Sequence, residues 1–435
     1  MNYKKFFKDI SIIFVITIIG SILSYLIRMI FARQLTISEY GLFYSVIGLF
    51  AFFAIFRSLG TSEALIHFIP KYLVEKKLNK VSFAIKLVFY IQFIFGAIVS
   101  ILFFVFAKWI AINFIHIESA YILIRINSVT YFIIGFAELL KNVFRGYQKN
   151  ILSSMYDSIR MLFVLLLVVI ILKLNVVNVT NIMGIWLSSY IILLIIYLFF
   201  FFKDIKLVKS KFDKLIIKDL KKYSIPLVIG MGAQIIFSKT DVLILTFLRG
   251  VTEVAYYEVV NPASKVITFL FIPIIFVIFP TVSKLFHEKD INTIKTLLQG
   301  IYSIGLFLVL PILIILMFLS KLVIMLIFGS KYLLTSNALV IMFVGAFFLM
   351  FADINFNVLS GMGEIKKKTK ILYTIVLFNI IGDIILIPLL GYLGAVIITS
   401  ISYFLLWLLG FIIIKKKINF TFKMISIKQI IKVIR

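Results

Sequence analysis

The chain of 435 residues contains no cysteine, so disulfide bonds and thiolate metal sites are excluded. Charged residues are also scarce, at 14% against about 25% in an ordinary soluble domain. Acidic residues are the scarcest group, because 18 Asp and Glu stand against 45 Lys and Arg, for a formal net charge of +27. No Gly-x-x-x-x-Gly-Lys-Ser/Thr phosphate loop occurs, which excludes ATP hydrolysis by that route.

Apolar residues dominate what is present. They make up 63% of the chain, and the mean hydropathy is +1.16. Apolar runs of about 20 residues recur from end to end, and this is the length that crosses a bilayer core of about 30 Å. We therefore expect an all-α polytopic membrane protein. The sequence predicts twelve spans, at residues 10–32, 40–62, 84–107, 119–140, 151–172, 181–202, 223–247, 255–281, 296–319, 333–360, 371–390 and 392–414.

The positions of the basic residues set the orientation. With the N-terminus in the cytoplasm, 33 of the 45 Lys and Arg residues lie in inner segments and six in outer loops. This bias is the positive-inside pattern of a multi-pass protein of the cell membrane with both termini in the cytoplasm. Because the charges lie in short loops between apolar runs, nucleic acid is not an expected partner, whereas membrane lipids are.

The most basic stretch divides the chain. Residues 203–222 carry eight lysines and are predicted to be a cytoplasmic bridge. Residues 1–202 precede it as an N-lobe with helices 1–6, and residues 223–414 follow it as a C-lobe with helices 7–12. Residues 415–435 form a basic cytoplasmic tail, which either lies on the anionic inner leaflet or is solvated and frayed.

The two lobes share an internal repeat. SEYGLFYSV at 38–46 matches TEVAYYEVV at 252–260, an offset of 214 residues. NVFRG at 142–146 matches NVLSG at 357–361, an offset of 215 residues. The first pair opens helices 2 and 8, and the second closes helices 4 and 10. Six spans per repeat predict two parallel six-helix repeats that are related by an axis along the membrane normal.

RQLTISEYGLFYSV at 33–46, followed by LGTSEALIHFIPKYL at 59–73, resembles the Wzx-type polysaccharide exporters. These oligosaccharide-lipid flippases belong to the multidrug/oligosaccharidyl-lipid/polysaccharide (MOP) superfamily, with the lipid II flippases and the MATE drug exporters. The resemblance implies two lobes around a central cavity and alternating access. It also implies a lipid-linked oligosaccharide as substrate, polysaccharide assembly proteins as partners, and a functional monomer.

Three cations within the predicted spans are candidate substrate-binding residues: Arg28, Arg57 and Lys265. They resemble the cationic cluster in the central cavity of lipid II flippases, with Lys265 in place of an arginine. An arginine fork suits a pair of pyrophosphate oxygens, and lysine supplies a point charge. The alternative is that Arg28 and Arg57 snorkel to opposite membrane interfaces.

Four oxygen-bearing side chains form a second candidate site: Asp241, Asn379, Asp383 and Thr399. Counted from the outer helix ends, Asp241, Asp383 and Thr399 lie about 10–12 Å below the surface. Asn379 shares a helix face with Asp383, and the four types resemble the sodium site of lipid II flippases. Na⁺ or H⁺ coupling is expected there. The alternative is structural, with Asp241 paired to Lys239 or another cation and Asp383 hydrogen-bonded within the bundle.

The remaining intramembrane charges carry no predicted site. Asp157 and Arg160 are three residues apart and are expected to pair. Arg125 and Glu138 are too far apart on one helix to pair with each other, and Asp353 receives no role. Helices 8 and 9 are expected to kink at their prolines, Pro262, Pro273, Pro280 and Pro311.

Two other functions compete with the flippase. One is a cation-coupled, MATE-like exporter of small amphipathic molecules, and the other is a membrane scaffold that does not transport. An enzyme is not expected, because no nucleophile–base constellation is visible and the outer loops are short. The cationic cluster favours an anionic, lipid-linked substrate.

Overall fold

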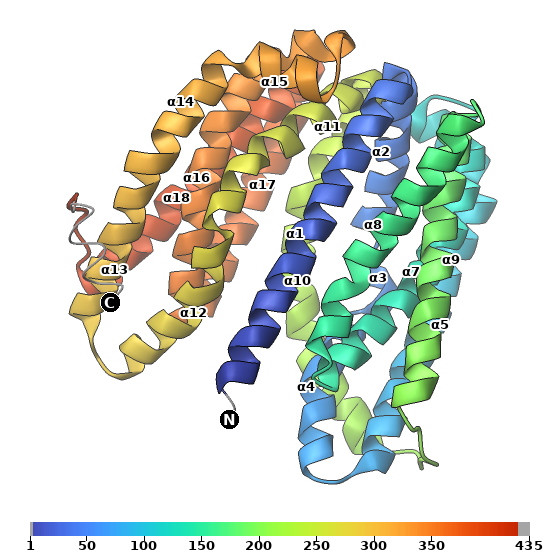
Figure 1. The fold of residues 1–435 in the computed structure, drawn as a ribbon, viewed down its shortest axis with the longest axis vertical. Helices are drawn as coiled ribbons and strands as arrows, with labels where there is room; N and C mark the ends of the chain where they lie inside the picture. Colours follow the sequence, from blue (N-terminus) through green and yellow to red (C-terminus); the bar gives the residue numbers. More distant parts are fainter. Residues whose placement is uncertain (1–2, 425–435) are drawn as a thin grey trace. The chain divides into compact units, whose positions relative to one another are not determined.

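The computed structural model describes residues 3–424, with side chains from Ser11 onward except those of residues 270, 273 and 276 (Figure 1). Every regular element in this part of the chain is a helix. Eleven helical stretches of the described chain are long and apolar enough to cross a bilayer. By internal packing the chain forms two compact units, Met1–Lys239 and Thr240–Arg435. The predicted lobe boundary at the 203–222 bridge stays a prediction.

The first unit is built around helix α7 (Ala120–Gly146), which packs against α2, α4, α5, α8 and α9. Its buried core joins apolar side chains of α4, α5, α7 and α9. The other elements are α1 (Tyr3–Gln34), α2 (Ile37–Phe52), α3 (Ile55–Ser58), α4 (Thr61–Val74), α5 (Leu78–Val105), α6 (Ala107–Ile110), η1 (Ala111–Ile115), α8 (Asn150–Lys173), α9 (Val179–Asp204) and the first part of α10 (Lys214–Arg249).

The second unit is built in the same way around α16 (Ser336–Gly361), whose main neighbours are α18, α12 and α11. It begins with the end of α10. The other elements are α11 (Val251–Ser264), η2 (Lys265–Phe271), α12 (Ile272–His287), α13 (Ile291–Ile304), η3 (Gly305–Val309), α14 (Leu310–Phe318), α15 (Ser320–Ile327), η4 (Ser330–Thr335), α17 (Ile365–Leu390) and α18 (Tyr392–Ile418).

The difference between twelve predicted spans and eleven long helices lies in one segment. The predicted span 255–281 is divided into α11, the 3₁₀ segment η2 and α12. Pro262 supplies no backbone N–H, and the α-helix ends two residues later. In predicted helix 9, the π-helical turn η3 directly precedes Pro311 in α14. The structure therefore confirms the expected irregularities in helices 8 and 9.

The internal repeat is visible in equivalent contacts of the two units. Glu39 of α2 accepts a hydrogen bond from the N-terminal amide of α9 at Val179, at 3.4 Å. Its repeat partner Glu253 of α11 accepts one from the N-terminal amide of α18 at Tyr392, at 2.6 Å. A carboxylate satisfies an orphan helix N–H in both cases.

The second repeated motif ends in a glycine that allows two helices to approach closely. A Cβ on Gly146 would lie 3.0 Å from the Leu65 carbonyl oxygen of α4. A Cβ on Gly361 would lie 3.1 Å from the Phe279 carbonyl oxygen of α12. Leu65 and Phe279 are themselves 214 residues apart, so both repeated motifs make equivalent contacts in the two units.

The bridge and the described part of the tail are ordered against their own units. The Val208 amide donates to Ser82 Oγ on α5 at 2.9 Å. In the tail, Phe420 is fully buried and packs on the ring of Tyr302 in α13, with centroids 6.2 Å apart. The tail up to residue 424 therefore folds back on the helices, and the predicted membrane contact of residues 425–435 lies outside the described residues.

Candidate functional site

An interrupted helix positions Arg57. The predicted span 40–62 is not continuous, because α2 ends at Phe52, the short α3 carries Arg57, and α4 begins at Thr61. Between α3 and α4 the backbone turns through Leu59 and Gly60, with φ of 47° and 72°. Irregular backbone at membrane depth is tolerated where it lines a cavity or is buried in protein. The break therefore indicates that Arg57 lies either beside a cavity or in a buried part of the protein.

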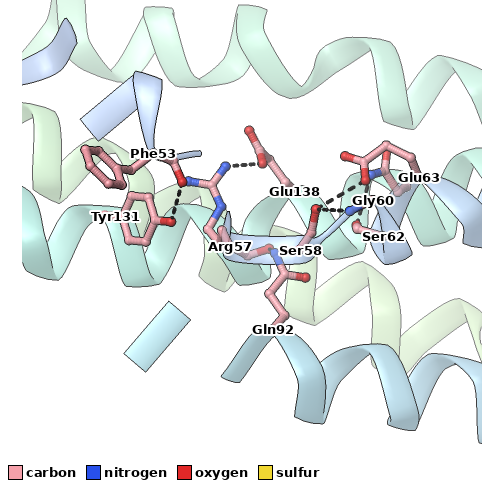
Figure 2. A network of polar contacts seen from close by, with 11 residues as sticks. Phe53, Arg57, Ser58, Gly60, Ser62, Glu63, Gln92, Tyr131 and Glu138 are labelled. Carbon is pink, nitrogen blue, oxygen red and sulfur yellow. Dashed lines mark hydrogen bonds and ion pairs between the residues drawn. The ribbon is translucent and has the colours of Figure 1, made fainter. Parts of the chain in front are cut away.

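Arg57 is 5% exposed, and its guanidinium forms an ion pair with Glu138 of α7. Figure 2 shows the guanidinium between this carboxylate and the Tyr131 ring, whose centroid lies 5.1 Å from Cζ. The Tyr131 hydroxyl donates to the Phe53 carbonyl oxygen at 2.9 Å, which fixes the ring on the broken segment. Gly135 leaves room for the Arg57 side chain, because a Cβ there would lie 3.0 Å from Arg57 Cδ.

A cavity of about 280 Å³ opens beside this ion pair, entirely within the first unit. Its lining combines three cations with two carboxylates and an amide. Glu138 remains 40% exposed there although Arg57 is buried. Arg145 is exposed and forms no ion pair within residues 11–424. The charged and amide side chains of the lining are Arg57, Glu63, Glu138, Lys141, Asn142 and Arg145.

The three predicted substrate cations have different surroundings. Arg28 of α1 is half-buried, with its guanidinium 4.3 Å from the centroid of the Tyr44 ring. Lys265 begins η2 and lies beside the Tyr403 side chain of α18, with Nζ 5.9 Å from the ring centroid. Arg28 and Arg57 belong to the first unit and Lys265 to the second. Their meeting in one cavity stays a prediction.

The second unit brings the predicted oxygen ligands together. Thr399 Oγ1 donates to Asp241 Oδ2 at 2.8 Å. The Asp383 carboxyl lies close enough to that of Asp241 for their charges to interact, and Asn379 lies one helical turn from Asp383. All four side chains are at most 3% exposed. The structure adds Tyr257 of α11, whose hydroxyl donates to Asp241 Oδ2.

Unpaired oxygens show that this cluster fits a hard cation. Asp241 Oδ1, both carboxylate oxygens of Asp383, and the side-chain oxygen and nitrogen of Asn379 have no hydrogen-bond partner in the described chain. Buried carboxylates are costly unless a cation or proton compensates them. Oxygen donors of this kind suit hard cations. The four-residue site stays a prediction, but its residues are arranged as one group.

One expectation about the other charges needs correction. Asp157 and Arg160 form no ion pair in the described structure; Asp157 instead contacts Lys141, at 3.4 Å. Arg160 stacks on Trp186 and Tyr190, with Cζ 4.5 and 4.7 Å from the ring centroids. Helical spacing suggested a local pair, but aromatic rings on the neighbouring helix α9 offered the arginine a better surface.

Sequence reasoning also missed the role of two residues. Glu138 had no predicted role because its partner Arg57 is 81 residues away, beyond any local pattern. Tyr257 was missed because a tyrosine in an apolar helix carries no ionisable signal. The available signal was its place in the repeated TEVAYYEVV motif, where the first unit has Phe43 at the equivalent position.

Known proteins match this chain along most of its length. A model of the polysaccharide biosynthesis protein family matches residues 6–286. An uncharacterized membrane protein of Methanocaldococcus jannaschii is 31% identical over 424 residues, covering 94% of this chain and 84% of the relative.

Two solved structures share the fold at low sequence identity. An inward-facing multidrug resistance MATE family transporter of the MOP superfamily has a TM-score of 0.77 and 16% identity, covering 94% of this chain and 98% of its own. The lipid II flippase MurJ, in an inward closed conformation, has a TM-score of 0.71 and 20% identity, covering 97% and 89%. The predicted fold class is thereby confirmed.

Proposed function

The chain belongs to the polysaccharide biosynthesis protein family, and from this premise we propose that it flips a polyprenyl-(pyro)phosphate-linked oligosaccharide from the cytoplasmic to the outer leaflet. Its architecture is that of a multi-pass membrane transporter of the MOP superfamily. Alternating access of the two lobes carries the substrate, without enzymatic chemistry, for the assembly of cell-surface polysaccharide. The chain acts as a monomer in the cell membrane, and polysaccharide assembly proteins are its partners.

The observation that carries this proposal is the cavity beside the broken helix. Three cations converge on it, and the Arg145 guanidinium has no carboxylate partner in the described part of the chain. A phosphate group presents several acceptor oxygens, and guanidinium groups bind such oxygens in pairs. An incoming phosphate also competes with Glu138 for Arg57, so binding and the breaking of this ion pair are linked. Arg28 and Lys265 supply further positive charge.

Mass spectrometry of co-purified lipids tests the proposal. We expect the wild type to retain a polyprenyl (pyro)phosphate sugar, and a variant with Arg28, Arg57 and Lys265 changed to glutamine to lose it. Arg125→Gln is the matched control, because this arginine contacts the Phe104 and Tyr121 rings away from the cavity. A lipid-linked sugar held equally by all three proteins would reject these residues. Specific retention of amphipathic drugs in its place would favour the MATE-like alternative.

We also propose that a monovalent cation, Na⁺ or H⁺, couples to transport at the four-residue cluster. Asp241, Asn379, Asp383 and Thr399 hold it, and it neutralises the two buried carboxylates. If Na⁺ is the ion, it stabilises the folded protein by mass action, and the midpoint of thermal unfolding rises with Na⁺ concentration. Asp383→Ala should remove this response. An unchanged midpoint in the wild type at every Na⁺ concentration would exclude sodium.

The proposed orientation has a simple test, because the chain has no cysteine of its own. A single cysteine at Ser210 in the bridge should react with a membrane-impermeant thiol reagent only after the cells are opened. Reaction in intact cells would reverse the proposed topology. The same cysteine-free background serves every labelling experiment on this chain.

A further inference from the structure

Two rows of polar side chains face each other inside the second unit. Tyr257 and Asn261 of α11 and Lys265 at the start of η2 follow at intervals of four residues. Thr399 and Tyr403 of α18 are also four apart. Residues four apart on a helix share a face, so each row runs along one side of its helix. The two rows make contact at two levels, which we call the upper and lower rungs.

The upper rung holds the carboxylate of the proposed cation site. The Tyr257 and Thr399 hydroxyls are 3.2 Å apart, and both groups bond to Asp241 Oδ2. Asn261 Nδ2 donates to the Tyr257 hydroxyl at 3.1 Å. The Tyr257 hydroxyl has one proton, and it donates this proton in the hydrogen bond to Asp241. Tyr257 thus orients Asp241 so that its other oxygen, Oδ1, is left for a cation.

The lower rung holds the proposed substrate cation of this unit. Lys265 lies beside the Tyr403 side chain, and the ammonium also experiences the charges of Glu258 and Asp241. Tyr403 is 4% exposed, so these interactions act with little solvent screening. Lys265 stands where the α-helix becomes a 3₁₀ segment, three residues after Pro262. A lysine at such a break can shift more easily than one inside a regular helix.

The first unit does not repeat the α11 row, because Phe43, Ile47 and Ala51 stand at the positions of Tyr257, Asn261 and Lys265. Phe43 occupies the repeat position of Tyr257 and packs edge-on against Trp186 of α9, with centroids 5.6 Å apart. An aromatic contact therefore stands where the second unit has a hydroxyl pair. Packing of α11 on α18 does not by itself require the α11 row, because α2 packs on α9 with apolar residues at the equivalent positions.

We propose that these two rungs couple the cation site to substrate binding, with Tyr257 and Tyr403 as positioning residues. This inference rests on the proposed flippase function and its cation site. Occupation of the Asp241–Asp383 pair fixes the upper rung and reduces the negative charge near Lys265, to which Glu258 also contributes. The rungs carry the change along α11 and α18 to Tyr403, which then presents the ammonium to an anionic lipid headgroup. A cation therefore tightens binding of the lipid phosphate.

The test is the affinity of the purified full-length protein for undecaprenyl phosphate, measured by native mass spectrometry with and without Na⁺. For the wild type we expect Na⁺ to raise this affinity at least about fivefold, the lower end of usual coupling between sites. By reciprocity, the lipid should raise the affinity for Na⁺ by the same factor. Tyr403→Phe should reduce the Na⁺ effect to less than about twofold, because it removes the Tyr403 hydroxyl beside Lys265 and leaves the upper rung in place.

A second readout separates coupling from damage to the cation site. Tyr403→Phe should keep the Na⁺-dependent rise in unfolding temperature, since it leaves Asp241 and its ligands untouched. Tyr302→Phe is the matched control: it removes a buried tyrosine hydroxyl of the same unit that bonds to Asn355 and Trp407, away from the rungs. This control should keep both Na⁺ effects. Asn261→Ala removes the donor to Tyr257 in the upper rung and should likewise reduce the effect of Na⁺ on lipid affinity.

The possible results separate this inference from the function on which it rests. If Tyr403→Phe and Asn261→Ala retain the full effect of Na⁺ on lipid affinity, direct charge interaction between the cation site and Lys265 suffices. The rungs then have no part in the coupling. If the wild type binds the lipid with no dependence on Na⁺, the coupling is wrong while the flippase proposal stands. If the wild type binds no lipid phosphate in any salt, the substrate proposal fails, and this inference fails with it.

Discussion

The two units are built on one frame but carry opposite chemistry. Each breaks its second helix in the same region, since residues 51–57 correspond to η2 at 265–271 through the offset of 214. Each break carries a buried or half-buried cation, Arg57 in one unit and Lys265 in the other. The first unit then pairs its cation with Glu138, whereas the second gathers two carboxyl groups at Asp241 and Asp383. The two units share a helical frame and have diverged in the charged groups that they bring together.

The largest difference in stability between the two units should come from the acidic residues at one repeat position, Glu138 and Asp353. Glu138 and Asp353 correspond through the offset of 215, but only Glu138 has an ion-pair partner in the described chain. Glu138→Ala leaves the buried Arg57 unpaired. We expect a loss of about 2–3 kcal/mol, less than for fully buried pairs because Glu138 is 40% exposed. Chemical unfolding in detergent measures this difference.

Asp353→Ala is the counterpart in the other unit. It removes a carboxylate without an ion-pair partner, so the free energy of unfolding should stay within about 1 kcal/mol of the wild type. Equal losses in the two variants would mean that the units do not differ in this respect. A double variant Arg57→Leu with Glu138→Leu should recover part of the loss, because it leaves no buried charge alone.

The repeated glycines test the shared frame directly. Gly146→Val and Gly361→Val each push a side chain toward a backbone carbonyl, at 3.0 and 3.1 Å from the added Cβ. We expect each to cost about 1–3 kcal/mol by overpacking. Gly184→Ala is the control, because a Cβ there meets nothing within 4 Å. A large loss in one unit and none in the other would show that the repeat has lost its common packing.

Much of this frame could be predicted from the sequence, because it depends on local signals. Apolar runs, basic loops and prolines predict the spans, their orientation and their kinks directly. The repeated motifs identify Glu39 and Glu253 as equivalent positions of the two units. The break at Phe53–Gly60 was missed, since no proline marks it and only Gly60 hints at it. The grouping of Asp241, Asp383 and Thr399 followed from helix depth. The Arg57–Glu138 pair and the stacking of Arg160 depend on which helices touch, which one sequence does not reveal.

A smaller effect concerns the paired glutamates at the helix starts. Glu39→Ala and Glu253→Ala each remove a carboxylate that accepts from the first amide of another helix. Each should cost about 1 kcal/mol, as for other capping residues. Glu39 also closes a capping box with Thr36, so its variant should be the more destabilised of the two. Glu75→Ala, at an exposed loop, should change stability by less than about 0.5 kcal/mol. Thermal unfolding of the four proteins ranks them, and a larger loss from Glu253→Ala would contradict this order.

The smallest effect is found where the units have exchanged charges. Lys149 pairs with Asp204 at 2.6 Å in the first unit, and Glu364 pairs with Lys417 at 2.9 Å at the corresponding place in the second. Double-mutant cycles should give a coupling of about 0.2–1 kcal/mol for each partly exposed pair. The swapped variant Lys149→Glu with Asp204→Lys should keep the stability that either single change loses, because the second unit already uses that polarity.

The pH dependence of unfolding tests the Glu364 ion pair by itself. Hydrogen bonds from Lys417 and then Lys367 lower the pKa of Glu364 below its usual value near 4.5. The folded state therefore binds this proton less readily than the unfolded state, and the stabilisation is complete above about pH 4.5. It is lost as the pH falls through the lowered pKa. Glu364→Gln should remove this part of the acid dependence of unfolding, which denaturation at a series of pH values measures. If the variant follows the wild-type curve, the ion pair adds no stability, and the reversed polarity of the second unit is incidental.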